Sequence, residues 1–151
     1  MTRSRKEVLT VLQGARQPLS AAAVHQQLGP CCDQATVYRT LHYLEDQGMA
    51  ESFVLYCTEH GTERYYTAVK AANGSPLPHR HWFHCIRCHA FMELGSCAVS
   101  TMVHAFEESQ QVSVRHHVLY LTGLCRECLS HEDSKPADAG NRTTPQENPD
   151  F

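Results

Sequence analysis

The chain has 151 residues, a hydrophobic content of 42% and a formal net charge of −3 at pH 7. These values are typical of a soluble globular protein, and no apolar run approaches the ~20 residues that a membrane-spanning helix needs. The first residues carry charges without a continuous apolar stretch, so we expect no signal peptide and a cytoplasmic location. In that compartment, the eight cysteines are expected to be thiols and metal ligands rather than disulfides.

Three short helices are predicted near the N-terminus, because apolar residues recur there at helical spacing. The first covers residues 4–15. The second begins after Ser20, a suitable N-cap, and ends before Gly29. The third follows Asp33, which can also cap a helix, and ends near Gly48, where a helix C-terminus favours glycine.

Two β-prone runs, at 52–56 and 63–69, predict a hairpin after these helices. Three short helices and a hairpin within 70 residues are typical of a winged helix-turn-helix, so we assign residues 1–69 to such a domain. Residues 1–44 contain five basic residues against two acids, a local net charge of +3. A basic surface of this kind is compatible with a nucleic-acid partner.

The pattern changes after residues 70–78, which contain one glycine and two prolines and are expected to form a hinge. Residues 79–131 are predicted to form a small α+β domain, and the polar tail at 132–151 is predicted to be disordered. Three strands are expected in the second domain, at 80–85, 90–94 and 112–121.

The helix expected between the second and third of these strands has an apolar stripe at helical spacing. We interpret this stripe as a face that packs in a core. Its members are Val99, Met102, Val103 and Phe106.

Four cysteines form two Cys-x-x-Cys pairs that are separated by 36 residues. A turn of this type presents two sulfurs to one ion, and zinc takes four tetrahedral ligands at about 2.3 Å. We therefore predict one closed structural zinc site, against the alternative of two chance pairs of buried thiols. Cys57 and Cys97 lack this spacing, although both are able to reach a metal. The predicted zinc ligands are Cys85, Cys88, Cys125 and Cys128.

Histidines in front of the first pair suggest a second metal. His79 and His81 alternate, so both point to one face of a strand. Glu93 on the next predicted strand, and His116 or His117 on the last one, can complete a site of nitrogen and carboxylate ligands that suits Zn²⁺, Fe²⁺ or Mn²⁺. The alternative is a solvated polar face. Such an open site is exchangeable, which is what a sensor requires.

These motifs resemble the ferric uptake regulator (Fur) family of metal-dependent repressors, which includes the zinc-responsive Zur and peroxide-responsive PerR branches. The similarity spans roughly residues 3–130. It rests on ATVYRTL at 35–41, the histidine-rich run before Cys-x-x-Cys, the acid five residues after the second cysteine of that pair, and GLCREC at 123–128. The resemblance implies an N-terminal winged helix, a C-terminal α+β dimerisation domain, a structural zinc held by four cysteines, and a regulatory metal near the hinge.

Carried over by position, the four paired cysteines match the structural zinc ligands. Glu93 matches an acidic ligand of the regulatory region, and His117 matches a histidine eight residues before the third cysteine. Members of the family usually have the second histidine three residues before the first cysteine, whereas His81 is four before it. Either a bulge at 82–84 restores the facing of His81, or His84 is the ligand.

The third predicted helix carries candidates for contact with DNA. With its apolar face buried, Tyr38, Arg39 and His42 lie on other faces, and Arg39 can pair with phosphate or with guanine. The resemblance matches Tyr38 and Arg39 to residues that face DNA. The full set of candidates is Tyr38, Arg39, Thr36, His42, Arg3 and Arg5.

We interpret the chain as a homodimeric, metal-responsive repressor of a double-stranded DNA operator, without a small-molecule substrate or a membrane partner. Zinc is favoured as the sensed metal, because Pro18 and Tyr66 stand where many Fur proteins have a histidine and an acid. An iron- or manganese-sensing regulator is the runner-up, and Glu93 argues against peroxide sensing, which uses Asp.

Two rivals belong to other classes. A zinc hydrolase is disfavoured because the HxE with PCxxC and the HExxH patterns are both missing. A zinc-stapled interaction module without DNA binding is the second rival.

Overall fold

The computed structural model describes residues 1–57 and 61–132. The N-terminal part contains three α-helices, one 3₁₀ turn and one antiparallel sheet with strand order β1-β3-β2. Its elements are α1 (Arg3–Gly14), β1 (Leu19–Ser20), α2 (Ala21–Leu28), η1 (Gly29–Cys31), α3 (Gln34–Asp46), β2 (Ala50–Cys57) and β3 (Gly61–Ala68).

The two predicted helix caps are confirmed. The side chain of Ser20 accepts the N–H of Ala23 at 3.2 Å, and the carboxylate of Asp33 accepts the N–H of Thr36 at 2.7 Å. The hydroxyl of Thr36 donates to the same carboxylate at 3.1 Å, and both hydrogen bonds from Thr36 lower the pKa of Asp33. Gly48 follows α3 at φ 61°, a backbone conformation that glycine adopts without strain. Local capping therefore fixes where α2 and α3 begin and where the chain turns into β2.

The helices pack on the sheet around one apolar core. The predicted stripe of α3 is buried there, because its apolar residues recur on the face that meets α1 and α2. The most deeply buried members are Val8, Val24, Val37, Leu41, Leu44 and Tyr66.

A second sheet forms the C-terminal part, with strand order β5-β4-β6 and a parallel pairing between β4 and β6. The predicted α+β fold class is thus confirmed. The elements are β4 (Trp82–Cys85), β5 (Phe91–Glu93), α4 (Ser100–Gln110), β6 (Tyr120–Gly123) and α5 (Arg126–Glu132).

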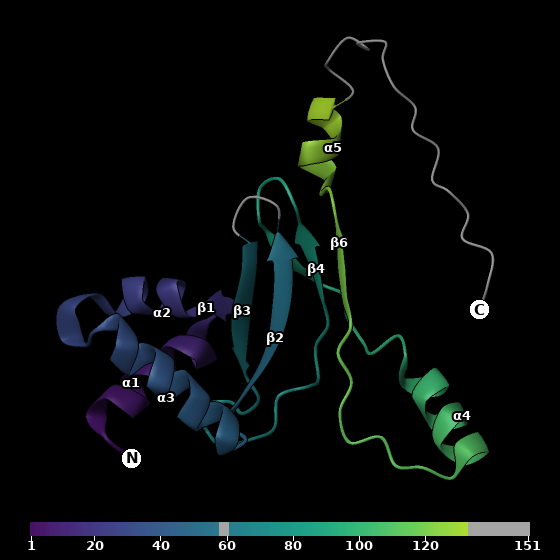
Figure 1. Cartoon of the computed structure of the whole chain (residues 1–151), viewed down its shortest axis with the longest axis horizontal. Coiled ribbons are helices and arrows are strands. Elements are labelled where there is room, and N and C mark those ends of the chain that lie inside the picture. The colour runs from purple at the N-terminus through teal and green to yellow at the C-terminus, as the bar shows by residue number, and fades with distance from the viewer. Residues whose placement is uncertain (58–60, 133–151) are drawn as a thin grey trace.

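Two expectations for this part are wrong. The strand expected at 112–121 exists only as Tyr120–Gly123, because the run RHH at 115–117 interrupts the alternation and Glu107 binds the N–H of Val114 instead, at 2.7 Å. The stripe of α4 does not pack in a core. Met102 is 65% exposed, Phe106 is 53% exposed, and no side chain of this fully described helix is buried. Figure 1 shows α4 projecting away from both sheets.

The two sheets meet through aromatic rings. Phe53 of β2 and Tyr65 of β3 come from the first sheet, and Phe91 of β5 and Tyr120 of β6 come from the second. The ring centroids of Tyr65 and Phe91 are 4.9 Å apart, and those of Phe53 and Tyr120 are 6.2 Å apart. We call these four rings the inter-sheet aromatic cluster.

Within residues 1–57 and 61–132, no helix has the length and apolar character needed to cross a bilayer. The predicted disordered tail falls almost entirely outside the described residues, and its first residue, Glu132, is the last of α5.

Candidate metal centres

The four paired cysteines converge at one end of the second sheet. Cys85 ends β4, and Cys88 follows in the turn to β5. Cys125 and Cys128 come from the junction of β6 with α5. Their four Sγ atoms all lie within 4.8 Å of one another, and the Sγ atoms of Cys88 and Cys125 are 3.7 Å apart. The parallel pairing of β4 with β6 brings these segments together, although 36 residues separate the pairs.

This arrangement fits a tetrahedral zinc ion. Four sulfurs at about 2.3 Å from one ion are about 3.8 Å apart, which agrees with the observed separation. Burial raises the pKa of Cys85, but hydrogen bonds from the backbone N–H groups of Cys88, Cys125 and Arg87 outweigh it and lower the pKa to about 6. Those N–H donors therefore favour the thiolate of Cys85, the form that binds a metal, whereas burial and the neighbouring thiols raise the pKa of Cys128 to about 12.

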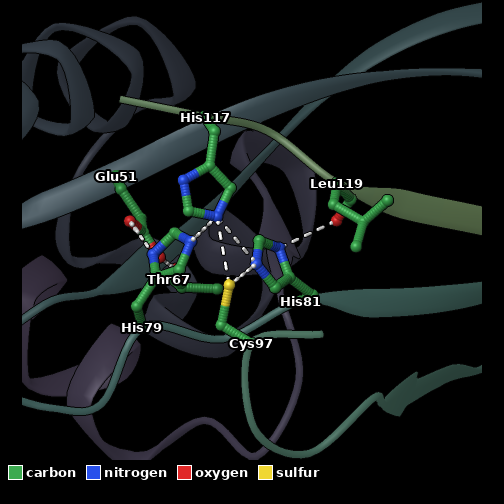
Figure 2. Close-up of polar contacts among 7 residues, drawn as sticks. All are labelled: Glu51, Thr67, His79, His81, Cys97, His117 and Leu119. Atoms are coloured by element: carbon green, nitrogen blue, oxygen red, sulfur yellow. Dashed lines mark hydrogen bonds and ion pairs between the residues drawn. The ribbon is translucent and has the colours of Figure 1, made fainter. Parts of the chain in front are cut away.

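A second cluster begins just after residues 70–78, the predicted hinge, and contains three imidazoles and one thiol. His79 and His81 lie just before β4, Cys97 lies just before α4, and His117 lies before β6 (Figure 2). Nε2 of His117 is 3.2 Å from Nε2 of His79 and 3.1 Å from Nε2 of His81. The Sγ of Cys97 is 3.2 Å from Nε2 of His81 and 3.3 Å from Nε2 of His117.

These contacts have the dimensions of a metal site. Nitrogen ligands about 2.0–2.1 Å from a tetrahedral ion are about 3.3–3.4 Å apart, close to the observed separations. Four donor atoms facing one another at such distances suit a common ion. Burial lowers the pKa of His81, and the nearby ring of His79 acts in the same direction. Both effects favour the neutral imidazole, which is the form that coordinates metals.

The other ring nitrogens hold two of the histidines in place. Nδ1 of His81 is 3.2 Å from the carbonyl oxygen of Leu119, so its N–H can donate there and leave Nε2 free to coordinate. Nδ1 of His79 is 3.8 Å from a carboxylate oxygen of Glu51, and Thr67 donates a hydrogen bond to the other oxygen at 3.3 Å. Glu51 is in β2 and Thr67 is in β3, so the first sheet supports this cluster directly (Figure 2).

The structure separates the other predicted ligands from this cluster. Glu93 is exposed on β5, opposite Trp82 in the strand register. The register of β4 with β5 is regular, so the bulge considered for residues 82–84 is not formed, and His81 reaches the cluster because it precedes the strand. His84 is buried near the ring of Phe91, at a centroid distance of 4.8 Å. His116 is exposed next to His117, outside the group of four donors.

The candidates for DNA contact lie around the exposed side of α3 and the start of α1. Tyr38 is 50% exposed and Arg39 is exposed. Arg39 donates to the hydroxyl of Thr36 at 3.2 Å, and the ring of His42 lies 4.6 Å from that of Tyr38. In α1, two arginines already have partners in the chain. Arg3 pairs with Glu7 at 2.8 Å, and the guanidinium of Arg5 lies 3.6 Å from the ring centroid of Tyr43.

Solved structures with the same fold are found among metal regulators. Fur from Helicobacter pylori is 20% identical, with 85% of this chain and 81% of that chain covered and a TM-score of 0.65. Fur from Vibrio cholerae is 23% identical, with coverages of 83% and 91% and a TM-score of 0.63. A zinc uptake regulator in complex with zinc and DNA is 26% identical, with coverages of 87% and 85% and a TM-score of 0.57.

The sequence itself carries the family relationship. No curated protein matches the chain. A sequence model described as the Ferric uptake regulator family does match it over residues 1–122. Because this match covers most of the 151 residues, the chain belongs to the ferric uptake regulator family.

Proposed function

We propose that this protein is a zinc-responsive transcriptional repressor that binds double-stranded operator DNA as a homodimer. The observation that carries the choice of metal is the second cluster, in which His79, His81 and His117 meet the thiol of Cys97 without a carboxylate among the four donors. Imidazole and thiolate ligands suit zinc, whereas Mn²⁺ prefers oxygen ligands and non-haem Fe²⁺ sites commonly include a carboxylate.

The zinc-bound regulator described above supports this choice, since it binds both zinc and DNA. The four-cysteine cluster is the proposed structural zinc site, because four thiolates leave no open coordination position. The cluster beside the hinge is the proposed exchangeable site. An iron- or manganese-sensing role remains the second candidate, and the carboxylate of Glu51 beside His79 is the observation in its favour.

The position of the second cluster suggests how the metal acts on DNA binding. All four donors belong to segments that flank the second sheet, while Glu51 belongs to the first sheet. The ring of His79 lies beside Glu51, so a metal that fixes this ring also ties the second sheet to the first. Metal binding therefore favours one orientation of the winged helix. Coupling of this kind is worth about 1–3 kcal/mol. Tyr38 and Arg39 of α3 are then the proposed reading residues in the major groove.

Selection of DNA fragments from a random-sequence pool tests this function. We expect the zinc-loaded protein to enrich one duplex family, and we expect removal of the exchangeable metal with a mild chelator to abolish the enrichment. Ferrous iron or manganese restoring the enrichment where zinc does not would favour the second candidate. If the protein retains no duplex with any of these three metals, even at low salt, the remaining candidate is an interaction module without DNA binding.

The exposed stripe of α4 is the proposed dimer contact. Amphipathic helices bury their apolar face against something, and here neither sheet covers it. We expect Phe106→Glu to turn the zinc-loaded dimer into a monomer in sedimentation velocity, because a charge would be buried in the contact. Thr101→Glu inserts the same charge on the opposite, polar side of α4 and should leave the dimer intact. Equal behaviour of the two variants would remove α4 from the interface.

A further inference from the structure

A hollow lies between α3 and the β-hairpin, on the side of α3 that presents Tyr38. The N-terminus of α2 closes one end, α3 forms one wall and β3 forms the other. The lining residues used below are Ala21, Ala22, Gln34, Tyr38, Arg64 and Tyr66.

Strand alternation brings Arg64 and Tyr66 of β3 to this side, together with Thr62. The ring of Tyr66 contacts that of His42 in α3, whereas the ring of Tyr65 contacts Phe91 on the opposite face. Arg64 shares the face of Tyr66. Glu63 also lines the hollow, and its carboxylate accepts a hydrogen bond at 3.1 Å from the hydroxyl of Tyr65, which belongs to the opposite face.

The hydroxyl of Tyr66 is a buried donor without a partner. Tyr66 is 1% exposed, and its hydroxyl makes no hydrogen bond within the part of the chain that the structure describes. Burial raises the pKa of this hydroxyl and outweighs the opposing charge of Arg64. Buried polar groups in native proteins are nearly always paired, so an unpaired donor on a residue that lines a hollow points to a ligand.

Arg64 is held in position from two sides. Its Nη1 donates to the hydroxyl of Ser52 at 3.1 Å and lies 3.6 Å from the carboxylate of Glu45, which belongs to α3. An arginine has five N–H donors, and among the described residues only Nη1 is engaged. The guanidinium is therefore pre-positioned beside α3 with donors to spare.

The N-terminus of α2 adds a third favourable element. The first N–H groups of a helix have no partner inside the helix, and this end carries a partial positive charge. Ser20 caps the N–H of Ala23, while Ala21 and Ala22 line the hollow. Cation, hydroxyl and helix N-terminus together are the elements of a phosphate site.

We infer that this hollow binds a phosphate of the DNA backbone, held by Arg64, the hydroxyl of Tyr66 and the N-terminus of α2. The inference rests on the proposed function. A second hollow on the other side of α3 is lined by Thr2, Arg5, Thr36 and Arg39. A helix in the major groove lies between two phosphate backbones, and α3 is flanked in the same way by a hollow that contains an arginine on each side.

The experiment uses the full-length zinc-loaded protein and the duplex that the wild type selects. The affinity of the protein for this duplex is measured by fluorescence anisotropy over a series of salt concentrations. We expect Arg64→Gln to weaken binding about tenfold at 0.1 M salt and to reduce the slope of log affinity against log salt by about one. Arg64→Lys should restore the slope, and Arg115→Gln, a surface arginine of the C-terminal part, should change neither value.

Tyr66→Phe gives a second, independent readout. It should weaken DNA binding several-fold without changing the salt slope, because the hydroxyl is neutral. The unfolding temperature should stay the same or rise, because a buried unpaired hydroxyl is removed. Wild-type affinity in both Arg64→Gln and Tyr66→Phe would overturn the phosphate site and leave the repressor intact. A wild type that selects no duplex would overturn the repressor as well.

Discussion

Replacing Cys125 by serine is expected to unfold the second sheet and leave the winged helix folded. The three strands of that sheet have only four, three and four residues. The buried cluster beneath them consists of Cys85, Cys125 and Cys128, with Phe83 and Leu124 against it. The ligands of the proposed zinc are thus themselves the core. Binding of a structural zinc contributes on the order of 10 kcal/mol to folding, which so small a core cannot replace.

Hydrogen exchange read by mass spectrometry measures this effect segment by segment. Amides of β4 and β6 should lose protection in Cys125→Ser, whereas amides of α1 and α3, which have a separate apolar core, should keep it. Cys32→Ser is the matched control, because Cys32 only borders the first core and lies outside both clusters. Wild-type protection of β6 in Cys125→Ser, with one chelator-resistant zinc still bound per chain, would contradict the structural role.

Replacing His81 by alanine is expected to abolish the exchangeable site and spare the structural one. His81 is 2% exposed and lies at the centre of the cluster, within hydrogen-bond distance of both Cys97 and His117. Without it, three donors remain and the site opens to water. We expect the exchangeable zinc to bind at least ~100-fold more weakly, since even outer partners of a metal site are worth 10–100-fold. Affinity for DNA should then fall about 5- to 150-fold, to its metal-free level.

Competition with a fluorescent zinc chelator measures the first effect, and DNA anisotropy at fixed free zinc measures the second. Cys97→Ser should give the same result, because a hydroxyl is a poor zinc ligand. His116→Ala is the matched control, since this histidine is adjacent in sequence to His117 but exposed and outside the group of four. Unchanged DNA affinity in His81→Ala, with the exchangeable zinc gone, would separate this cluster from regulation.

Most of the first half of the fold was predictable because its signals are local. Ser20 and Asp33 each bind an N–H three residues ahead, so the sequence around them suffices to place the helix starts. The pairing of β2 with β3 follows from two β-prone runs close in sequence. The prediction that the apolar stripe of α4 packs in a core was wrong for a physical reason. Periodicity shows that a face is apolar, but it does not show whether the partner is in the same chain.

The two candidate metal centres were predictable to different extents. The four-cysteine site follows from two short motifs, each of which sets half of the geometry. The second site depends on the tertiary fold. His79 and His81 have a recognisable spacing, but Cys97 is a single cysteine in a loop, and only the path of the chain before α4 brings it to them. Glu51 lacked any sequence signal, because it contributes through the packing of one sheet on the other.

If the protein releases DNA on losing zinc, as proposed, the inter-sheet aromatic cluster has a consequence for the speed of that response. Contacts among Phe53, Tyr65, Phe91 and Tyr120 involve no metal ligand, so they should persist when the exchangeable ion leaves. The released protein then needs only a small readjustment of packed surfaces, a motion of microseconds to milliseconds. The lag between a fall in zinc supply and release from the operator would be governed by how fast the ion dissociates.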